Sequence, residues 1–166
     1  MKNKTDKEEF ILDLADGTNE PVGSGPNPED FKTPELCLKY IKYNGNFLEF
    51  VPEEFKTLEM CLIAVQMPPM GLVSPLEYVP EKWKTPEVCK AALQQNGFAL
   101  KSIPEKYLTP ELCLEAVQYD GAILRYVPEK YKTPELCRIA MENESCTIPK
   151  DILLRYIPKE YRDKLA

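Results

Sequence analysis

Cysteine is the residue of this chain with the widest range of chemistry, because thiolates bind metals, form disulfides and act as nucleophiles. No Cys-x-x-Cys pair occurs among the six, and Cys146 alone stands outside a regular series. Equivalent positions of packed helices lie about 8–10 Å apart, beyond the ~7 Å limit between the Cα atoms of a disulfide. We therefore expect a series of unbridged, buried thiols in a reducing compartment, with Cys146 the accessible one. The series recurs every 24 or 28 residues, at Cys37, Cys61, Cys89, Cys113 and Cys137.

Glutamates recur with the same spacing and could be paired catalytic carboxylates: Glu35, Glu59, Glu87, Glu111 and Glu135. Two-carboxylate hydrolysis needs one acid in apolar and one in polar surroundings, which equivalent positions of a repeat do not supply. Their positions favour helix N-termini, where negative charge is stabilising. The chain contains no histidine, which excludes His-based triads and His metal sites. Without a Gly-rich phosphate loop or a serine elbow, we expect no enzyme activity, no cofactor and no metal.

The repeated cysteines and glutamates belong to an internal repeat, and each unit of this repeat predicts the same secondary structure. Threonine is a good N-cap, proline suits the first helical position, and glutamate suits the first turn, so each unit predicts a helix of about ten residues. Asn-Gly or Asp-Gly then ends that helix, with glycine expected in the left-handed conformation. The string Thr-Pro-Glu-Leu-Cys, or a close variant, occupies residues 33–37, 57–61, 85–89, 109–113 and 133–137.

The second half of each unit predicts a shorter helix and a tight turn. In one unit this helix extends from Ala122 to Val127 and ends before Pro128, since a residue that precedes proline avoids the α region. The sequence Pro-Glu-Lys-Tyr then predicts a single 3₁₀ turn into the next threonine. The repeat also places an aromatic residue two positions before each threonine, and we call these residues the aromatic column. We expect Trp83 of this column to be largely buried between units.

Helices of this length cannot bury their apolar faces within one unit, so the units must stack. The predicted fold is an all-α solenoid of five ~24-residue helix–turn–short-helix repeats with a C-terminal half-repeat cap. Residues 29–166 form this repeat domain. Residues 1–28 form an acidic N-terminal segment and a Gly/Pro-rich linker.

Two segments, Ala91–Leu100 and Ala116–Tyr126, carry a pattern of the type A-V-x-x-N-G-x-x-L-x-Y. In this pattern the chain resembles a bacterial family of uncharacterised helical repeats of roughly 24 residues, over about residues 29–166. That family has no assigned function, so the resemblance implies a repeat scaffold and no reaction. Insertions and the turn prolines Pro80, Pro104 and Pro128 depart from the family's commonest form.

Charge is concentrated in the first 30 residues, which hold three lysines and eight acidic residues of a chain with net charge −6. The remainder is nearly neutral and has no basic stripe, so we expect no nucleic-acid binding. The longest apolar run has five residues, so no membrane interaction is expected. No apolar stretch follows the first lysines, which predicts a cytoplasmic protein, with delivery to a host cell left open.

Binding residues are expected where the repeat departs from its own pattern. The second unit carries a Pro-stiffened insertion whose apolar side chains are Met67, Met70, Leu72 and Val73; it either packs on its own repeat or forms a binding tip. A polar column after the first helices, including Gln94, Gln118 and Tyr119, is either a solvated face or a shallow groove. The predicted function is a non-enzymatic protein–protein interaction module with a protein partner of unknown identity. The alternative is an inhibitor or accessory subunit that acts through the acidic N-terminal segment.

Overall fold

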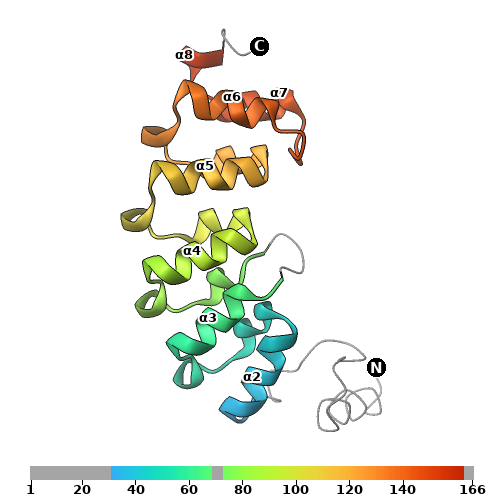
Figure 1. Cartoon of the computed structure of the whole chain (residues 1–166), viewed down its shortest axis with the longest axis vertical. Helices are drawn as coiled ribbons and strands as arrows, with labels where there is room; N and C mark the ends of the chain where they lie inside the picture. The colour runs from blue at the N-terminus through green and yellow to red at the C-terminus, as the bar shows by residue number, and fades with distance from the viewer. Residues whose placement is uncertain (1–30, 69–72, 163–166) are drawn as a thin grey trace.

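Five parallel helices stacked one on the next form one layer of the molecule (Figure 1). The computed structural model describes residues 31–68 and 73–162. Helices and turns account for all the regular structure in these ranges, which confirms the all-α solenoid. The first helices of the five units are α2 (Pro34–Tyr43), α3 (Leu58–Gln66), α4 (Pro86–Gln95), α5 (Pro110–Tyr119) and α6 (Pro134–Glu142).

Each first helix begins as its sequence predicts. The N-cap threonine has an extended backbone, and its hydroxyl oxygen accepts a hydrogen bond from the backbone N–H three residues later, over 3.1–3.3 Å. Four of the five helices have proline at the first position, and the first turn of each contains a glutamate. Local capping and the helix dipole therefore fix where each first helix begins.

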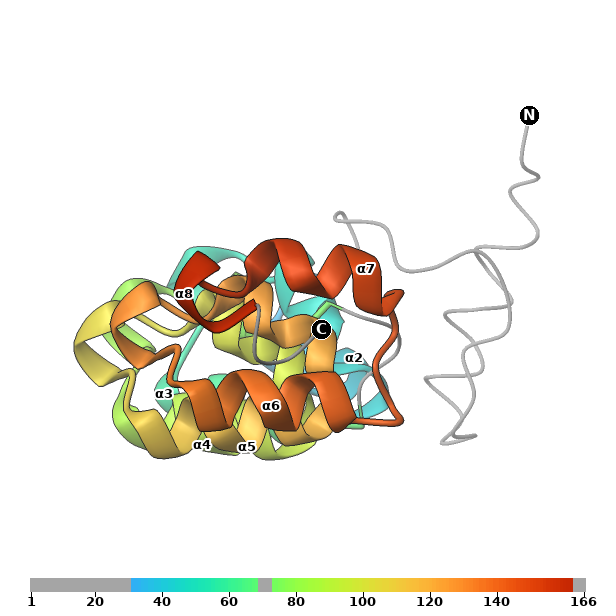
Figure 2. The same cartoon turned by 90° about the horizontal axis from the view of Figure 1, so that it is seen from above.

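A second layer of 3₁₀ helices packs behind the first helices (Figure 2). Each of these elements ends before a Val-Pro or Ile-Pro pair, and a three-residue 3₁₀ turn leads from the proline into the next N-cap. The second helix is thus as short as expected, but tighter than an α-helix. The elements of this layer are η2 (Gly45–Phe50), η4 (Pro75–Tyr78), η6 (Gly97–Ser102) and η8 (Gly121–Tyr126), and the turns are η3 (Glu53–Phe55), η5 (Glu81–Trp83), η7 (Glu105–Tyr107) and η9 (Glu129–Tyr131).

Glycine after the first helix has a different role from the one the sequence predicts. None of the three described glycines has a left-handed backbone, so the expected left-handed cap is wrong. A Cβ atom on Gly45 would lie 2.0 Å from the carbonyl oxygen of Ala64 in the next unit, and one on Gly121 would lie 2.4 Å from that of Ala140. Close approach of the following first helix therefore requires these glycines.

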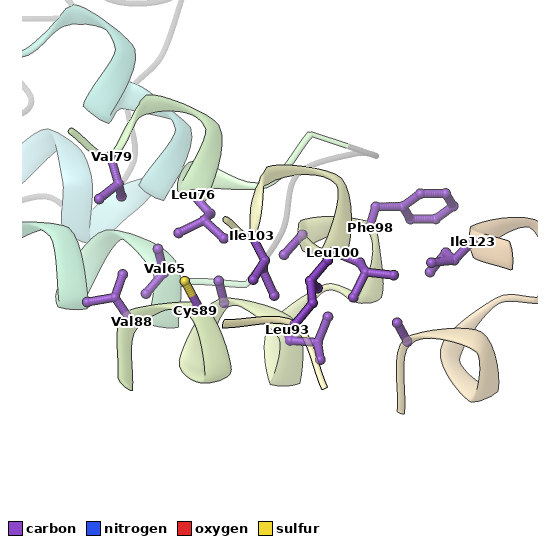
Figure 3. Close-up of a cluster of buried hydrophobic side chains, with 14 of the residues drawn as sticks. Val65, Leu76, Val79, Val88, Cys89, Leu93, Phe98, Leu100, Ile103 and Ile123 are labelled. Atoms are coloured by element: carbon purple, nitrogen blue, oxygen red, sulfur yellow. The ribbon is translucent and has the colours of Figure 1, made fainter. Parts of the chain in front are cut away.

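One continuous apolar core runs between the two layers. The five repeated cysteines are 0% exposed, in agreement with their prediction as small buried side chains. Figure 3 shows Cys89 of α4 beside Val65 of α3 and Leu76 of η4, so that residues of successive units interdigitate. Because each unit completes the core of its neighbour, no unit is expected to fold alone.

The aromatic column lies at the edge of the core rather than inside it. Phe31 is buried, whereas Phe55, Trp83, Tyr107 and Tyr131 are partly buried and pack against the core, so Trp83 is covered less completely than a core residue. A buried N–H or O–H needs a partner, and Trp83 and Tyr131 each find one at this edge. Trp83 Nε1 donates a hydrogen bond to the Lys56 carbonyl oxygen over 2.9 Å, which ties its unit to the preceding one.

The C-terminal half-unit covers α6, the first helix of the fifth unit. It consists of α7 (Lys150–Leu153), η10 (Leu154–Tyr156) and α8 (Lys159–Arg162). Leu153 and Ile157 are buried against the core, while Arg162 donates hydrogen bonds to the Ile157 and Arg155 carbonyl oxygens. This half-unit matches the predicted cap. The expected domain boundary near residue 28 lies outside the described residues.

Candidate functional site

The C-terminal ends of the first helices lie along one side of the stack, on the right in Figures 1 and 2. We call this side the C-terminal edge and define it as the last two residues of each first helix together with the described residues 67–68, 73–74 and 143–149. The described parts of both departures from the repeat length fall on it. The opposite side, with the N-caps and the 3₁₀ turns, is the N-terminal edge.

Large apolar side chains are exposed mainly along the C-terminal edge. Four such side chains are exposed in the part of the chain that the structure describes, and three of them are Tyr119 (48%), Tyr43 (41%) and Val73 (36%). The fourth, Leu36, lies in the first turn of α2. An edge with several exposed apolar groups among polar ones is typical of a surface that contacts another protein.

The residues predicted to bind a partner fall on this edge to the extent that the structure describes them. Gln94 and Gln118 are exposed in the last turns of α4 and α5, and Tyr119 ends α5. Met67 is partly buried as the C-cap of α3, so it contributes less surface than expected. The predicted residues Met70 and Leu72 lie outside the described residues.

The aromatic side chain of Tyr119 is held by the preceding unit. Its ring contacts that of Phe98 edge-to-face, with 6.4 Å between the centroids. A Cβ atom on Gly97 would lie 2.7 Å from the Tyr119 Cβ, so the absence of a side chain there lets the tyrosine approach. A tyrosine fixed in this way offers contact area at a low cost in conformational entropy.

A shallow depression of about 200 Å³ lies beside this tyrosine, between the C-terminal ends of α5 and α6. Gln118, Ile139, Glu142 and Asn143 line it. The side-chain amide of Asn143 donates hydrogen bonds to the carbonyl oxygens of Val117, over 2.8 Å, and Gln118, over 3.0 Å. These bonds satisfy carbonyls at the end of α5 and join the two helices across the depression.

The last insertion packs on its own array. The backbone N–H of Thr147 donates to Asp120 Oδ1 over 3.1 Å, and the same oxygen accepts from the Ala122 N–H over 2.8 Å. Cys146, expected to be accessible, is partly buried, and its thiol lies 3.3 Å from the Ile148 carbonyl oxygen. The segment 143–149 thus forms a fixed wall of the C-terminal edge.

One residue of this surface was missed by sequence reasoning about the site. Tyr43 belongs to the predicted polar column, at the repeat position of Tyr119, and it is exposed. Ile139 lines the depression although its sequence position indicates only a helix interior. Its partial exposure depends on how far α5 and α6 diverge, which the sequence does not encode locally.

Among the described residues, the repeated cysteines and glutamates lie in surroundings that do not favour reactivity. Burial raises the pKa of Cys61, Cys89 and Cys113 to about 11, which disfavours the nucleophilic thiolate. The pKa of Glu35 is lowered by hydrogen bonds from its own backbone N–H and from the hydroxyl of its N-cap threonine. The pKa of Glu111 is lowered by the equivalent groups of its own helix, as expected for charges at a helix N-terminus. No cluster of three potential metal ligands occurs in residues 31–68 and 73–162. Within the same ranges, no helix has the length and hydropathy to cross a bilayer.

Comparison with family models identifies the repeat. The model described as a domain of unknown function, DUF4116, matches residues 33–73 and 109–162, which together make up more than half of the chain. Searches of curated proteins and of solved structures gave no match. The repeat between the two matched segments, with α4 and η6, has the same helix–3₁₀ organisation as its neighbours. The chain therefore belongs to the DUF4116 family.

Proposed function

We propose that this protein is a non-enzymatic binding module whose C-terminal edge contacts a partner protein. The observation that carries the proposal is the concentration of exposed apolar side chains at this edge, with Tyr43, Val73 and Tyr119 on separate units. Exposed apolar side chains that gather on one face mark surfaces that contact other proteins, whereas isolated ones are ordinary. Gln94 and Gln118 supply hydrogen-bonding groups around them.

The rigidity of the edge supports this proposal. Tyr119 is held against Phe98, and Asn143 joins α5 to α6, so part of the surface is ordered before any partner binds. A preformed surface loses less conformational entropy on binding than one that must become ordered. The edge therefore favours recognition by shape and side-chain complementarity over folding upon binding.

Affinity capture with matched variants tests the proposal. The full-length protein is immobilised and exposed to an extract of the cells that produce it, at low and high salt. We expect a protein retained by the wild type to be lost when Gln118→Ala and Tyr119→Ser are combined, because both exposed side chains lie on the proposed surface. The retained protein is identified by mass spectrometry.

Leu36→Ser provides the control, because Leu36 is also an exposed apolar residue but lies at the N-terminal edge. This variant should retain the same protein as the wild type. Equal capture by all three proteins would contradict the proposed surface. Thermal melting of both variants shows whether the substitutions leave the fold intact.

The inhibitor or accessory-subunit alternative concerns residues 1–28, which lie outside the described residues, and it remains a prediction. Removal of these residues distinguishes the two functions. A module that acts through its C-terminal edge keeps its partner after this deletion, whereas an inhibitor that acts through an acidic segment loses it. High salt should also weaken the second kind of complex more strongly, since exposed charges are screened.

A further inference from the structure

A hollow of about 290 Å³ opens at the N-terminal edge, between the first turns of α2 and α3. We call it the first groove. Its floor is apolar and consists of Leu38, Phe55 and the buried Met60. Its rim carries three exposed carboxylates, from Glu35, Glu54 and Glu59. The first groove therefore combines an apolar base with a negatively charged opening.

The later repeats show which group is missing from the first groove. In three of them a lysine precedes the aromatic residue of the 3₁₀ turn, and its ammonium lies over the neighbouring ring: Lys82 over Trp83 at 5.3 Å, Lys106 over Tyr107 at 4.7 Å and Lys130 over Tyr131 at 5.0 Å from the centroid. In the first unit this position is Glu54, beside Phe55. The first unit thus has an aromatic ring without the repeat's own cation, and an additional carboxylate in its place.

Two of the three carboxylates of the first groove have no ion-pair partner among the described residues. Neither Glu54 nor Glu59 forms an ion pair within the described ranges, while Lys56 is engaged by Glu53 over 2.7 Å and by the Tyr78 carbonyl oxygen over 3.3 Å. Backbone and hydroxyl donors at the start of α2 lower the pKa of Glu35. Three carboxylates therefore surround the apolar floor.

From this combination we propose that the first groove binds a lysine side chain supplied by a partner protein. The aliphatic stem of the lysine would cover Leu38 and Met60, as long charged side chains cover apolar surface elsewhere. Its ammonium would lie among the carboxylates, near the face of Phe55, and replace the cation that the repeat provides in later units. Charge complementarity selects this occupant over an anionic one. The chain's own first 30 residues are a poor occupant, because their excess of acidic residues has the same sign as the rim.

This site is independent of the proposed function, because it lies at the opposite ends of the first helices from the C-terminal edge. Loss of binding at one edge leaves the other unchanged. Failure of the lysine site therefore does not count against the C-terminal edge, and the reverse also holds.

Nuclear magnetic resonance titration of the isotopically labelled, full-length protein tests the proposal. The probe is a capped Leu-Lys-Leu tripeptide, and its control is the same peptide with Nε-acetyllysine, which lacks the charge. We expect saturable shifts of the Leu38 and Met60 methyl resonances with the lysine peptide. The acetylated peptide should bind at least ten-fold more weakly.

Glu54→Lys fills the first groove with the lysine that later repeats already contain, so this variant should fold and should bind the peptide at least ten-fold more weakly. The reciprocal substitution Lys82→Glu should create a second site at the next groove, which has Leu62, Val88 and the carboxylates of Glu59 and Glu87 at the equivalent positions. Peptide binding there is detected by the fluorescence of Trp83, the chain's single tryptophan. Neither variant alters the C-terminal edge.

Several results would overturn the lysine site. Equal affinity for both peptides would show that the ammonium is not recognised, and unchanged affinity of Glu54→Lys would place binding elsewhere. If the first groove resonances shift with protein concentration alone, a second copy occupies it. If Glu54→Lys by itself shifts resonances of Lys2, Lys4 or Lys7, the chain's own N-terminal residues occupy it.

Discussion

At the scale of single residues, hydrogen bonds from aromatic side chains join neighbouring units. The Tyr131 hydroxyl donates to the Leu108 carbonyl oxygen over 2.9 Å, and Trp83 makes the corresponding bond to Lys56 two interfaces earlier. Each bond reaches the residue just before the N-cap of the preceding first helix. The partly buried aromatic column therefore aligns the 3₁₀ turns of successive units as well as covering the core.

Tyr131→Phe should reduce the free energy of unfolding by about 1 kcal/mol, because it removes one hydrogen bond and leaves the carbonyl oxygen of Leu108 without this donor. Tyr107→Phe is the matched control, since the Tyr107 hydroxyl makes no hydrogen bond to a described residue. Urea unfolding of the two variants measures the difference. Equal losses of stability would contradict a specific role for the Tyr131 hydroxyl.

The buried thiols predict how stability depends on pH. Burial raises the pKa of Cys89 to about 11, whereas a thiol in the unfolded chain ionises near pH ~8.5. The unfolded state therefore loses its proton first as the pH rises, so the stabilisation is complete below pH ~8.5 and declines toward pH 11. Cys89→Ala should be less stable than the wild type at pH 7, and this gap in the free energy of unfolding should narrow by about 3 kcal/mol at pH 11. A gap that does not change with pH would contradict the raised pKa.

At the scale of elements, the first helices could be predicted almost residue by residue. Thr-Pro-Glu fixes their starts through local capping, and the Val-Pro and Ile-Pro pairs fix the ends of the 3₁₀ elements through the restriction before proline. The role of glycine could not be predicted, because it depends on the backbone of the next unit. The exposure of Gln94, Gln118 and Tyr119 follows from the repeat phase, whereas the first groove and the depression beside Tyr119 depend on the spacing of neighbouring helices.

Gly45→Ala should cost at least 1–3 kcal/mol of stability, the range for overpacking, because the added methyl group would overlap the Ala64 carbonyl oxygen of the next unit. Gly97→Ala should cost less, because part of its overlap is with the flexible end of the Ile123 side chain. Thermal unfolding of both variants gives the comparison. If Gly45→Ala is as stable as the wild type, the close contact between α3 and η2 is not required.

At the scale of the whole molecule, stability comes from interfaces between successive units. The apolar core is continuous, but each first helix packs on its neighbours in the chain, so a local defect should remain local. Trp83→Ala should destabilise less than the ~3–5 kcal/mol typical of fully buried aromatic residues, since its ring is only partly buried. Hydrogen exchange should accelerate mainly in α3 and α4. Uniform acceleration from α2 to α6 would indicate one cooperative unit instead.

A repeat array also separates its two edges. The N-terminal edge carries the caps, the ion pairs of the 3₁₀ turns and the first groove, whereas the C-terminal edge carries the exposed tyrosines and the segment 143–149. One stack can therefore present two surfaces of different chemistry to different parts of its surroundings. We propose that the C-terminal edge is the surface that contacts a partner protein.

Site-specific photo-crosslinking tests this claim most directly. The photoreactive residue p-benzoylphenylalanine replaces Tyr119 on the C-terminal edge or Tyr107 on the N-terminal edge, so both substitutions start from a tyrosine. After irradiation in the producing cells, position 119 should give a discrete crosslinked protein that position 107 does not give. Crosslinking from position 107 alone, or equal products from both positions, would contradict the assignment of the C-terminal edge.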